Sequence, residues 1–554
     1  MNTLLKIFKW LAGSIVSLVG VIAIFCLVMH STVDLKEPSF TPAPGKAVVM
    51  DSLRILNDNY FRINPSGLLE IRVAGNASER GEAMGKLIPD LLEAQEKAFV
   101  DKLYEIVPAE AYRRFLMYFI YIFNRRLGEN VADEFREEIR AMSEYCTHKY
   151  DAYGTPYERQ MQYHSAHDIG HVMQDYMLVG CTSFAVWGDE SADGELLVGR
   201  NFDFYMGDEF AGRNMVLVER PDSGYAFISV TWPGMTGVLS GMNECGLTVS
   251  INASKLETPK MSATPVSILS REILQYASNI EEAMTIASFR KTFVSESLLI
   301  SSVEDGKAVV IEKTPSEISL FDPSAKDSSI HRLICTNHYQ SELFSERREN
   351  LANLEMSDSG ERWRRVEELL DSAGRLNPES AAAVLRDKKG LGGKSLGYCN
   401  ELAVNQLLAM HSVIFKPSER QLWVSAGPWQ CGEYVCFDLD DYIQAGIPVL
   451  SSENSIPADE FLMTEDYVKV MEFRKLSQYI HRATADRRKV PIDSLNRFIS
   501  LNPLYFNAYN IAGDYFSAIG DDNSACELWK KSLSFEMKRQ EKLAIEEKLS
   551  RAER

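Results

Sequence analysis

The chain has 554 residues, 45% of them hydrophobic, and a formal net charge of −19. This length exceeds what one compact core usually holds, so we expect two or three folding units. The acidic balance disfavours a nucleic-acid-binding surface, because phosphate binding needs clustered Lys and Arg side chains. The nine cysteines are scattered without a Cys-x-x-Cys pair, so the sequence indicates neither a disulfide framework nor a zinc ribbon.

The N-terminal end carries a long apolar run. Residues 10–29 are apolar except for two serines, which is about the length of a membrane-spanning helix. Two lysines precede the run and Asp34 and Glu37 follow it, so the positive-inside rule predicts a single pass through the cell membrane with the body outside the cytoplasm. A cleaved signal peptide is the alternative, although no small-x-small cleavage site follows the run. We predict a membrane anchor over residues 1–37.

Residues 38–180 form a segment between the anchor and the first cysteine of the body. The segment opens with a Pro-rich spacer, and residues 67–74 have the composition of a strand. From residue 77 to about residue 177, apolar residues recur at three- to four-residue spacing, which is typical of amphipathic helices. We therefore predict a mainly helical lead-in that ends just before Cys181.

Three histidines, His164, His167 and His171, lie near the end of this lead-in. On a helix the last two share a face at the i, i+4 spacing that can hold zinc, so a zinc hydrolase is one hypothesis. The Glu that metalloprotease motifs place between the histidines is missing, and a pair of packed histidines is the alternative. We expect neither a metal nor another cofactor.

A β-hairpin is predicted around Cys181. Two apolar, β-branched and aromatic runs at residues 180–187 and 196–204 flank the turn-forming residues 188–194. Cys181 stands at the start of the first strand, after a glycine, and the second strand ends in Arg-Asn-Phe-Asp. Because the end of the second strand folds back beside the start of the first, these polar side chains are expected near the thiol.

From the hairpin to about residue 450 the sequence alternates between short strands and turns. Helical blocks at residues 267–288 and 362–376 interrupt this pattern. Further strands are predicted at residues 215–220, 226–232, 246–252, 298–302, 411–415 and 421–426. Residues 181–450 are therefore predicted to form one mixed domain of the α+β class.

Beyond residue 451 the chain becomes helical and charged. Residues 502–533 resemble one helix pair of a tetratricopeptide repeat. Such units need neighbours to bury their apolar faces, so residues 464–500 are expected to supply a degenerate partner, or the pair docks on the catalytic body. We predict an all-α tetratricopeptide-like region over residues 451–554, with binding of a protein partner as a candidate role.

The cysteine at the head of the hairpin and the Arg-Asn-x-Asp pattern resemble the N-terminal-nucleophile (Ntn) cysteine hydrolases. The likeness is to the acyl-coenzyme A:6-aminopenicillanic acid acyltransferase type, with choloylglycine hydrolases and acid-ceramidase-like amidases as more distant relatives. An Asn-Glu-x-Gly-Leu turn at residues 243–247 and a Thr-Asn-His block at residues 336–338 follow in the family's order. The resemblance covers residues 181–427. It implies a four-layer αββα sandwich and autocatalytic cleavage before Cys181.

Cysteine suits acyl transfer, because its thiolate is strongly nucleophilic and forms a reactive thioester. Cleavage between Gly180 and Cys181 would free the α-amine of Cys181, whose pKa of about 7.7 to 8 lets it accept the thiol proton near neutral pH. The same thiol could begin the cleavage by attacking the Gly180 carbonyl, which glycine leaves accessible. One residue would then supply both nucleophile and base.

Four other residues complete the predicted catalytic set. Arg200 is expected to lower the pKa of the thiol, and Asp203 to hold the new amine, although an ordinary surface ion pair is the alternative for both. By the resemblance, Asn252 donates to the oxyanion, a contact worth about 3 to 4 kcal/mol in the transition state. Asn337 lines the site by the same resemblance, with His338 as an alternative general base.

Two residues are predicted to contact the substrate. Asn201 lies within the Arg-Asn-x-Asp pattern. Arg362 corresponds by the resemblance to a later arginine of the family, although Arg364 and Arg365 compete for that correspondence.

These observations predict a membrane-anchored amidohydrolase or acyltransferase that acts on a linear, non-peptide amide or acyl donor through a Cys181 thioester. The alternative is an anchored scaffold that has lost catalysis and binds peptides through its C-terminal region. The expected partners are a small-molecule substrate, the membrane and a protein at the C-terminal region, without nucleic acid. The sequence leaves open which acyl group is used and whether water or an amine accepts it.

Overall fold

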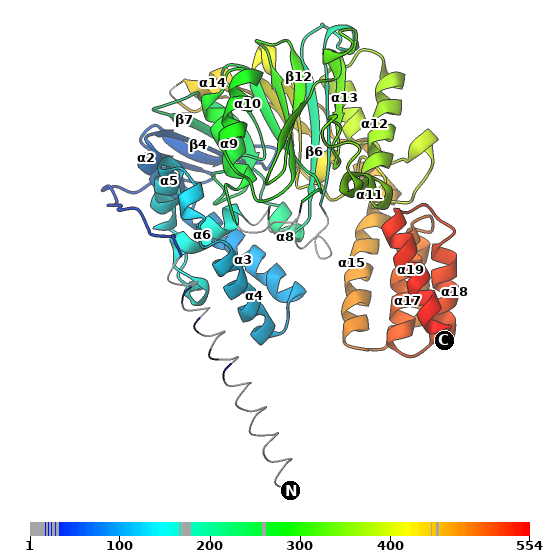
Figure 1. Cartoon of the computed structure of the whole chain (residues 1–554). Coiled ribbons are helices and arrows are strands. Elements are labelled where there is room, and N and C mark those ends of the chain that lie inside the picture. Colours follow the sequence, from blue (N-terminus) through cyan, green and yellow to red (C-terminus); the bar gives the residue numbers. More distant parts are fainter. Residues whose placement is uncertain are drawn as a thin grey trace.

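The computed structural model describes residues 33–165, 168, 179–257, 262–444, 446–449 and 454–553, and four single positions before residue 30. Two β-sheets lie at the centre of the catalytic body, packed face to face and covered by helices (Figure 1). A separate group of helices, formed by the C-terminal part of the chain, lies beside this body.

The larger sheet has eleven strands and the smaller sheet has six. In spatial order the larger sheet contains β1 (Val48–Met50), β2 (Leu53–Leu56), β3 (Asn59–Ile63), β4 (Leu69–Gly75), β7 (Met215–Pro221), β8 (Phe227–Thr231), β9 (Ser240–Asn243), β10 (Leu247–Ala253), β11 (Glu296–Ser302), β12 (Lys307–Lys313) and β13 (Ile318–Phe321). The smaller sheet contains β14 (Arg332–Cys335), β5 (Val179–Val186), β6 (Leu197–Phe204), β15 (His411–Lys416), β16 (Gln421–Ser425) and β17 (Tyr434–Asp438). Neighbouring strands are antiparallel, apart from the parallel pair β4 and β7.

Aliphatic side chains fill the space between the two sheets. Val198 of β6 and Val413 of β15 meet Val310 of β12 in one buried cluster. β10 and β11 are buried along their whole length, because the second sheet covers one face and helices cover the other. Polar side chains on these strands can pair across the ladder, as Thr248 and Ser301 do at 2.7 Å.

Helices cover both outer faces of this pair of sheets. α9 (Val266–Tyr276) and α10 (Ile280–Phe289) pack on the larger sheet, whereas α12 (Ser359–Ala373) and α13 (Pro378–Leu385) pack on the smaller one. Helices are thus confirmed in both blocks that the sequence predicted. The resulting order, helix, sheet, sheet and helix, is the mixed architecture that the resemblance implied. Shorter helices connect these layers: α8 (Asp208–Ala211), α11 (Arg348–Met356) and α14 (Leu439–Ile443).

The lead-in before Cys181 is helical, as predicted, but it also supplies strands to the body. β4 pairs with β7 over seven residues, so the lead-in extends the larger sheet. The sequence indicated a strand here but not its distant partner. The helices of the lead-in are α2 (Ala77–Leu87), α3 (Pro89–Ile106), α4 (Glu110–Phe123), α5 (Asp133–Ser143) and α6 (Pro156–His164).

A buried ion network joins α2 and α5 to the catalytic body. Arg80 binds Glu138 at 2.7 Å and Glu219 at 3.0 Å, and Arg271 binds Glu219 at 2.6 Å. These four side chains are at most 1% exposed. Removing one partner would leave a buried charge uncompensated, so the network strongly favours the docked lead-in.

The C-terminal region is helical, as predicted. Phe473 and Phe498 stack at a centroid distance of 4.6 Å within a buried cluster that also holds Trp529. The likeness of this region to tetratricopeptide repeats stays a prediction. Its helices are α15 (Glu465–Ala485), α16 (Ile492–Leu501), α17 (Phe506–Ala518), α18 (Asp522–Ser532) and α19 (Arg539–Ala552).

Two details of the predicted strands were wrong. Cys181 is the third residue of β5 and not its first, because the hydrogen-bonded ladder with β6 extends back to Val179. A further strand, β17, follows those expected to be last and pairs with β16.

Most of the predicted membrane anchor, residues 10–29, lies outside the described residues. Within the described part of the chain, no helix has both the length and the apolar character required to cross a bilayer.

Candidate active site

The β5–β6 hairpin distributes the candidate residues over the two faces of the smaller sheet. Cys181 pairs with Phe202, and Arg200 shares their face because it lies two residues before Phe202. Gly180 pairs with Asp203 on the opposite face. The thiol therefore faces the larger sheet, whereas Asp203 lies on the side that α12 covers.

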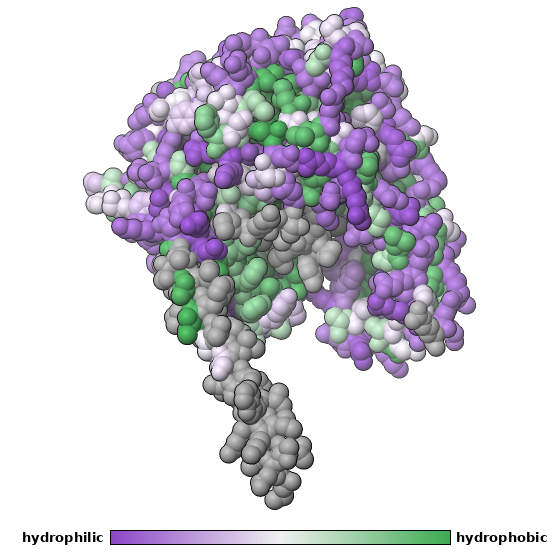
Figure 2. Space-filling model, viewed as in Figure 1, coloured by the Kyte–Doolittle hydropathy of each residue, from purple (hydrophilic) through white to green (hydrophobic). Residues whose placement is uncertain are grey.

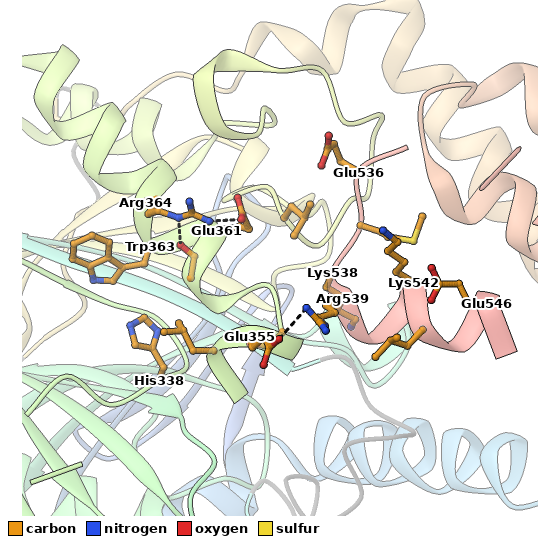
Figure 3. A pocket seen from close by; sticks show the side chains of 16 residues that line it. His338, Glu355, Glu361, Trp363, Arg364, Glu536, Lys538, Arg539, Lys542 and Glu546 are labelled. Atoms are coloured by element: carbon orange, nitrogen blue, oxygen red, sulfur yellow. Dashed lines mark hydrogen bonds and ion pairs between the residues drawn. The ribbon is translucent and has the colours of Figure 1, made fainter. Parts of the chain in front are cut away.

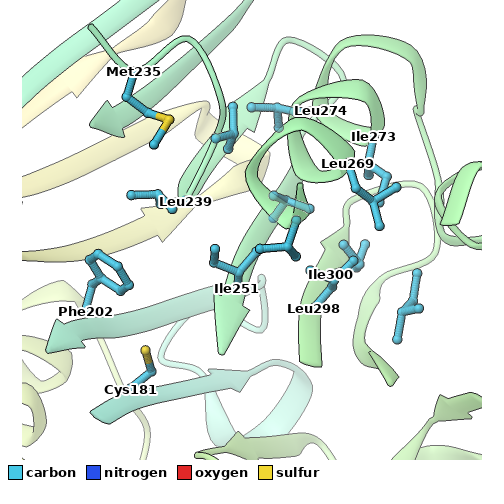
Figure 4. Packing of buried hydrophobic residues seen from close by; sticks show 14 of the residues in the cluster. Cys181, Phe202, Met235, Leu239, Ile251, Leu269, Ile273, Leu274, Leu298 and Ile300 are labelled. Carbon is cyan, nitrogen blue, oxygen red and sulfur yellow. The ribbon is translucent and has the colours of Figure 1, made fainter. Parts of the chain in front are cut away.

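The Cys181 thiol is fully buried beside Phe202 and Ile251 in an apolar cluster (Figure 4). Nη2 of Arg200 lies 3.8 Å from its Sγ. Burial raises the pKa of the thiol, Arg200 opposes this shift, and Asp203 adds to it, so the net shift is upward. The thiol of the uncleaved chain is thus protonated at neutral pH, and its activation requires a base.

Arg200 is fixed by acceptors of the larger sheet. Its Nη1 donates to the Leu239 carbonyl at 2.8 Å and contacts Ser240, and its Nη2 donates to the Ile251 carbonyl. Oγ of Ser240 lies 2.8 Å from Nε2 of His411. Burial, together with the nearby guanidinium, holds the pKa of His411 well below its usual range, so the ring is neutral. This arrangement directs one positive charge at the sulfur.

Aromatic side chains continue the apolar surface away from the thiol. Phe202 stacks on Phe204 at 5.7 Å, and Phe204 stacks on Trp232 at 6.3 Å. Phe204 and Trp232 line a small hollow of about 30 Å³ together with Phe99 and Met235. The cysteine side of the sheet is therefore suited to apolar groups.

The Asp203 carboxyl lacks the partner that a buried acid normally has. It is fully buried, and neither oxygen has a hydrogen-bond partner among the residues that the structure describes. Burial raises its pKa to about 8, while Arg362 opposes the shift, Asp358 adds to it and Arg200 opposes it. Because Asp203 is the register partner of Gly180, it lies beside the peptide bond that follows that glycine.

Arg362, in the first turn of α12, and Asn337 hold the backbone of Cys181 from the same side. Arg362 donates from Nη1 to the Cys181 carbonyl at 2.6 Å and from Nη2 to Oδ1 of Asn337 at 2.6 Å. The same Oδ1 accepts a hydrogen bond from the Cys181 N–H at 3.0 Å. Asp358 accepts from Nε of Arg362 at 2.8 Å. Asn337 therefore holds the N–H of the Gly180–Cys181 peptide, whereas Arg362 holds the carbonyl on the other side of Cys181.

The structure distinguishes Arg362 from its two neighbouring arginines. Arg364 pairs with Glu361, and Arg365 binds Asp387 at 2.8 Å. Of the three, Arg362 alone contacts the cysteine in the described chain.

Asn252, the predicted oxyanion donor, is engaged at the end of β10. Its Nδ2 donates to the carbonyls of Cys335 at 3.0 Å and Thr336 at 3.2 Å. Its Oδ1 accepts from Oγ of Ser183 at 2.9 Å. Both amide hydrogens are thus used in the uncleaved chain, so donation to an oxyanion would require at least one of these bonds to open. That role stays a prediction.

The structure does not bring Asn201 to the thiol. Its Nδ2 donates to the carbonyls of Leu385 at 2.9 Å and Val404 at 3.0 Å, and its Oδ1 accepts from Ser412 at 2.6 Å. The side chain lies on the face of β6 opposite the Cys181 side chain. These contacts tie α13 and the loop before β15 to the sheet, and they give no support to the predicted substrate contact.

His338, the alternative general base, is engaged with other groups. Its Nδ1 lies 2.9 Å from Oγ of Ser359 and 3.2 Å from Oγ1 of Thr336. Burial, followed by the charge of Arg362, lowers its pKa to about 4. Such a weak base favours the α-amine over His338 as the acceptor of the thiol proton.

The histidines of the alternative zinc hypothesis are only partly described. His164 is buried, with Nδ1 2.7 Å from the Gln160 carbonyl and Nε2 2.9 Å from Oγ1 of Thr236. His167 and His171 lie outside the described residues. Among the residues that are described, no group of three or more His, Cys, Asp or Glu side chains is placed to hold a metal ion.

Part of the chain matches a known family. Residues 190–428 match the acyl-coenzyme A:6-aminopenicillanic acid acyl-transferase family. The matched region is therefore similar to part of an acyl-transferase. It contains Arg200, Asp203, Asn252, Asn337 and Arg362, but it begins after the nucleophile candidate and ends before the C-terminal helices.

Individual proteins share only a low sequence identity with this chain. An uncharacterized protein of Archaeoglobus fulgidus is 27% identical over 188 residues, which cover 30% of this chain and 31% of that relative. The chain thus spans about a third of the curated relative it matches. A Caenorhabditis elegans N-acylethanolamine-hydrolyzing acid amidase ortholog has 18% identity and a TM-score of 0.33, covering 49% of this chain and 100% of the other. A mutant conjugated bile acid hydrolase from Clostridium perfringens has 14% identity and a TM-score of 0.32, covering 50% of this chain and 99% of the other.

Three residues of the site were missed by sequence reasoning. Asp358 lies four residues before Arg362, a spacing that brings side chains together on a helix and could have indicated the pair. Ser183, which holds Asn252, shares the face of Cys181 by the two-residue period of a strand. His411 carried no such local signal, because it reaches Arg200 across a strand pairing between residues 211 positions apart.

Proposed function

We propose that the chain is an Ntn cysteine amidohydrolase or acyltransferase that cleaves itself between Gly180 and Cys181. The mature enzyme then transfers an acyl group from a linear amide or acyl donor through a thioester on Cys181. The observation that carries this proposal is the buried, unpartnered Asp203 carboxyl beside the Gly180–Cys181 peptide. Cleavage would create an α-ammonium at Cys181, and this cation would form an ion pair with the Asp203 carboxylate.

Self-cleavage begins with attack of the Cys181 sulfur on the Gly180 carbonyl. The C–S bond forms, the C–N bond of the peptide breaks, and the thiol proton passes to the departing nitrogen. Water then hydrolyses the Gly180 thioester, which releases a carboxylate on Gly180 and restores the thiol. Glycine fits this position, because a Cβ there would lie 3.0 Å from Nε2 of Gln406 and 3.5 Å from Nη2 of Arg362.

Turnover uses the freed amine of Cys181 as the base, since an α-amine has a pKa of about 7.7 to 8. The amine takes the thiol proton, the sulfur attacks the substrate amide, and the amine returns the proton to the leaving group. Water or a second amine then attacks the thioester. Asp203 stabilises the ammonium form, and Arg200 stabilises the thiolate at 3.8 Å.

The acyl group of the substrate is proposed to be apolar. The thiol shares its cluster with Phe202, Phe204, Trp232 and Met235, and the aromatic rings lead away from the sulfur. A charged acyl group would lose its hydration against these apolar side chains.

The acyl-enzyme provides the test. The full-length protein is treated with p-nitrophenyl octanoate, and the masses of its fragments are measured before and after neutral hydroxylamine. The proposal predicts one octanoyl group on the fragment 181–554, removed by hydroxylamine and absent in Cys181→Ala. Cys335→Ala, which removes a neighbouring buried thiol, should still be acylated. A folded wild type that is never acylated would instead favour the scaffold function.

Membrane anchoring through residues 10–29 is part of the proposal. The Asp34 N–H donates to the Arg125 carbonyl at 2.6 Å, and the Gly128 N–H donates to the Asp34 carbonyl at 3.0 Å. The chain that follows the apolar run therefore enters the body just after the C-terminal end of α4. An anchor would hold α4 close to the bilayer surface.

The surface of α4 supports this orientation. Tyr112, Phe115 and Phe119 lie on one face of α4 and are 55%, 61% and 58% exposed. Figure 2 shows apolar surface over α3 and α4. Aromatic side chains are favoured at a membrane interface. Protease added to intact spheroplasts should digest the body, whereas complete protection of the body would refute the proposed orientation.

A further inference from the structure

The C-terminal helices contact a loop that also lies against the candidate site. This loop, residues 394–410, precedes β15. On one side, its Tyr398 exchanges two hydrogen bonds with Asn502 of the helical region, at 3.0 and 2.8 Å. On the other side, Gln406 lies against Gly180. The loop thus connects the helical region with the peptide proposed to be cut.

A chain of buried charges makes a second connection. Nζ of Lys538, the residue just before α19, lies 2.5 Å from Oε2 of Glu401 in the loop. Asp358 lies within electrostatic reach of both Lys538 and Glu401, and it binds Nε of Arg362 at 2.8 Å. The side chains of Lys538, Glu401 and Asp358 are 16%, 15% and 14% exposed, so solvent screens them only partly.

The surroundings of Lys538 are shown in Figure 3. Lys538 and Arg539 lie at the start of α19, and Arg539 pairs with Glu355 of α11 at 2.9 Å. Together with residues of α12 they line a hollow of about 740 Å³. The helical region thus meets the catalytic body at the helix that carries Arg362.

Two cations, Lys538 and Arg362, lie beside Glu401 and Asp358, and Lys538 also lies 3.7 Å from Glu541. Every edge of the Arg362 guanidinium is in use, because Nε binds Asp358, Nη1 binds the Cys181 carbonyl and Nη2 binds Asn337. Without Lys538, Glu401 would lack its own cation and compete with Cys181 and Asn337 for Arg362. Breaking a buried ion pair in this way is strongly unfavourable, so a shift of the guanidinium toward the unpaired carboxylate is the expected response.

We propose that Lys538 is a positioning residue of the active site, which neutralises Glu401 and Asp358 and so keeps Arg362 on Cys181 and Asn337. This inference rests on the proposed self-cleavage, because that reaction is where the position of Arg362 becomes measurable. It gives the C-terminal helical region, which lies outside the matched family region, a role in the chemistry. The region completes the site instead of serving only to recruit a partner.

The test follows self-cleavage of freshly synthesised full-length protein by mass spectrometry. Lys538→Met should slow the appearance of the fragment 181–554 about tenfold, since small misplacements of catalytic groups cost one to two orders of magnitude in rate. Lys538→Arg should restore most of the rate. Lys548→Met is the matched control, because Lys548 binds Asp514 at 2.8 Å entirely within the helical region. The control should cleave like wild type.

A double variant separates positioning from mere stability. Lys538→Met/Glu401→Gln removes one cation and one anion, so no unpaired Glu401 carboxylate remains to compete for Arg362, which keeps its pair with Asp358. Cleavage should return to within about threefold of wild type, although the ion pair with the helical region is still missing. A purely structural role of the pair predicts that the double variant stays slow.

The cleavage rates of these variants distinguish a positioning role of Lys538 from a structural role and from failure of the proposed function. If wild type and Lys538→Met cleave at equal rates, the positioning role is refuted while the proposed function stands. If Lys538→Met is slow but neither Lys538→Arg nor the double variant recovers, the pair has only a structural role. A folded wild-type chain that never cleaves refutes the proposed function and this inference with it.

Discussion

Replacing Asp203 by Asn should have opposite effects on the uncleaved chain and on the mature enzyme. In the uncleaved chain, burial raises the pKa of Asp203 from 3.8 to about 8. Because the folded-state pKa is raised, the contribution of this group to stability is complete below pH 3.8 and is lost as the pH rises toward 8. Each pKa unit corresponds to about 1.4 kcal/mol, so at pH 7 ionisable Asp203 lowers the free energy of unfolding by about 4 kcal/mol.

The assay uses Cys181→Ala, which cannot cleave, with and without Asp203→Asn. Urea unfolding should show that the double variant has a higher free energy of unfolding than Cys181→Ala. This difference should grow by about 3 kcal/mol between pH 5 and pH 7. Asp486→Asn, at an exposed position paired with Arg488, serves as the control and should leave the pH dependence unchanged. If the free energy of unfolding changes with pH in the same way with and without Asp203→Asn, Asp203 is not an unpartnered buried acid.

In the mature enzyme, replacing Asp203 by Asn should be harmful. There the Cys181 ammonium gives Asp203 a partner, so Asp203→Asn should impair turnover of the octanoyl ester, measured as the rate of nitrophenol release. Asn252→Ala should cleave at least partly but turn over about 10²- to 10³-fold more slowly, if the amide donates to the oxyanion. Arg271→Met should weaken retention of fragment 1–180 after cleavage, because Glu138 of that fragment then loses its ion pair with Arg271 at 3.4 Å, and gel filtration of the cleaved protein measures this. Cys181→Ser should cleave slowly, because a hydroxyl is a poorer nucleophile than a thiol.

The sequence was informative where chemistry depends on local spacing. The hairpin follows from two apolar runs around a turn, and its ends bring Cys181 near Arg200 and Asp203. The two-residue period of a strand places Asn201 and Asp203 together on the face opposite Arg200, and the contacts with Leu385, Val404 and Ser412 are what engage the Asn201 amide. No local pattern indicated these distant partners of Asn201.

Other features depend on contacts between distant segments. Three arginines follow Gly360 within five residues, and only the orientation of α12 on β5 selects Arg362. The parallel pairing of β4 with β7 joins strands about 140 residues apart, which no local pattern indicates. The same holds for Lys538, whose partner Glu401 lies in an irregular loop. From the sequence, the C-terminal helices therefore looked separable from the site.

The most direct test of the account is the intact mass, with N-terminal sequencing, of purified wild type and Cys181→Ala. The account predicts that wild type yields two fragments, the second beginning at Cys181 and ending at residue 554, whereas Cys181→Ala remains a single chain. A wild-type chain that stays whole while folded, or a cut at another bond that persists in Cys181→Ala, would contradict it.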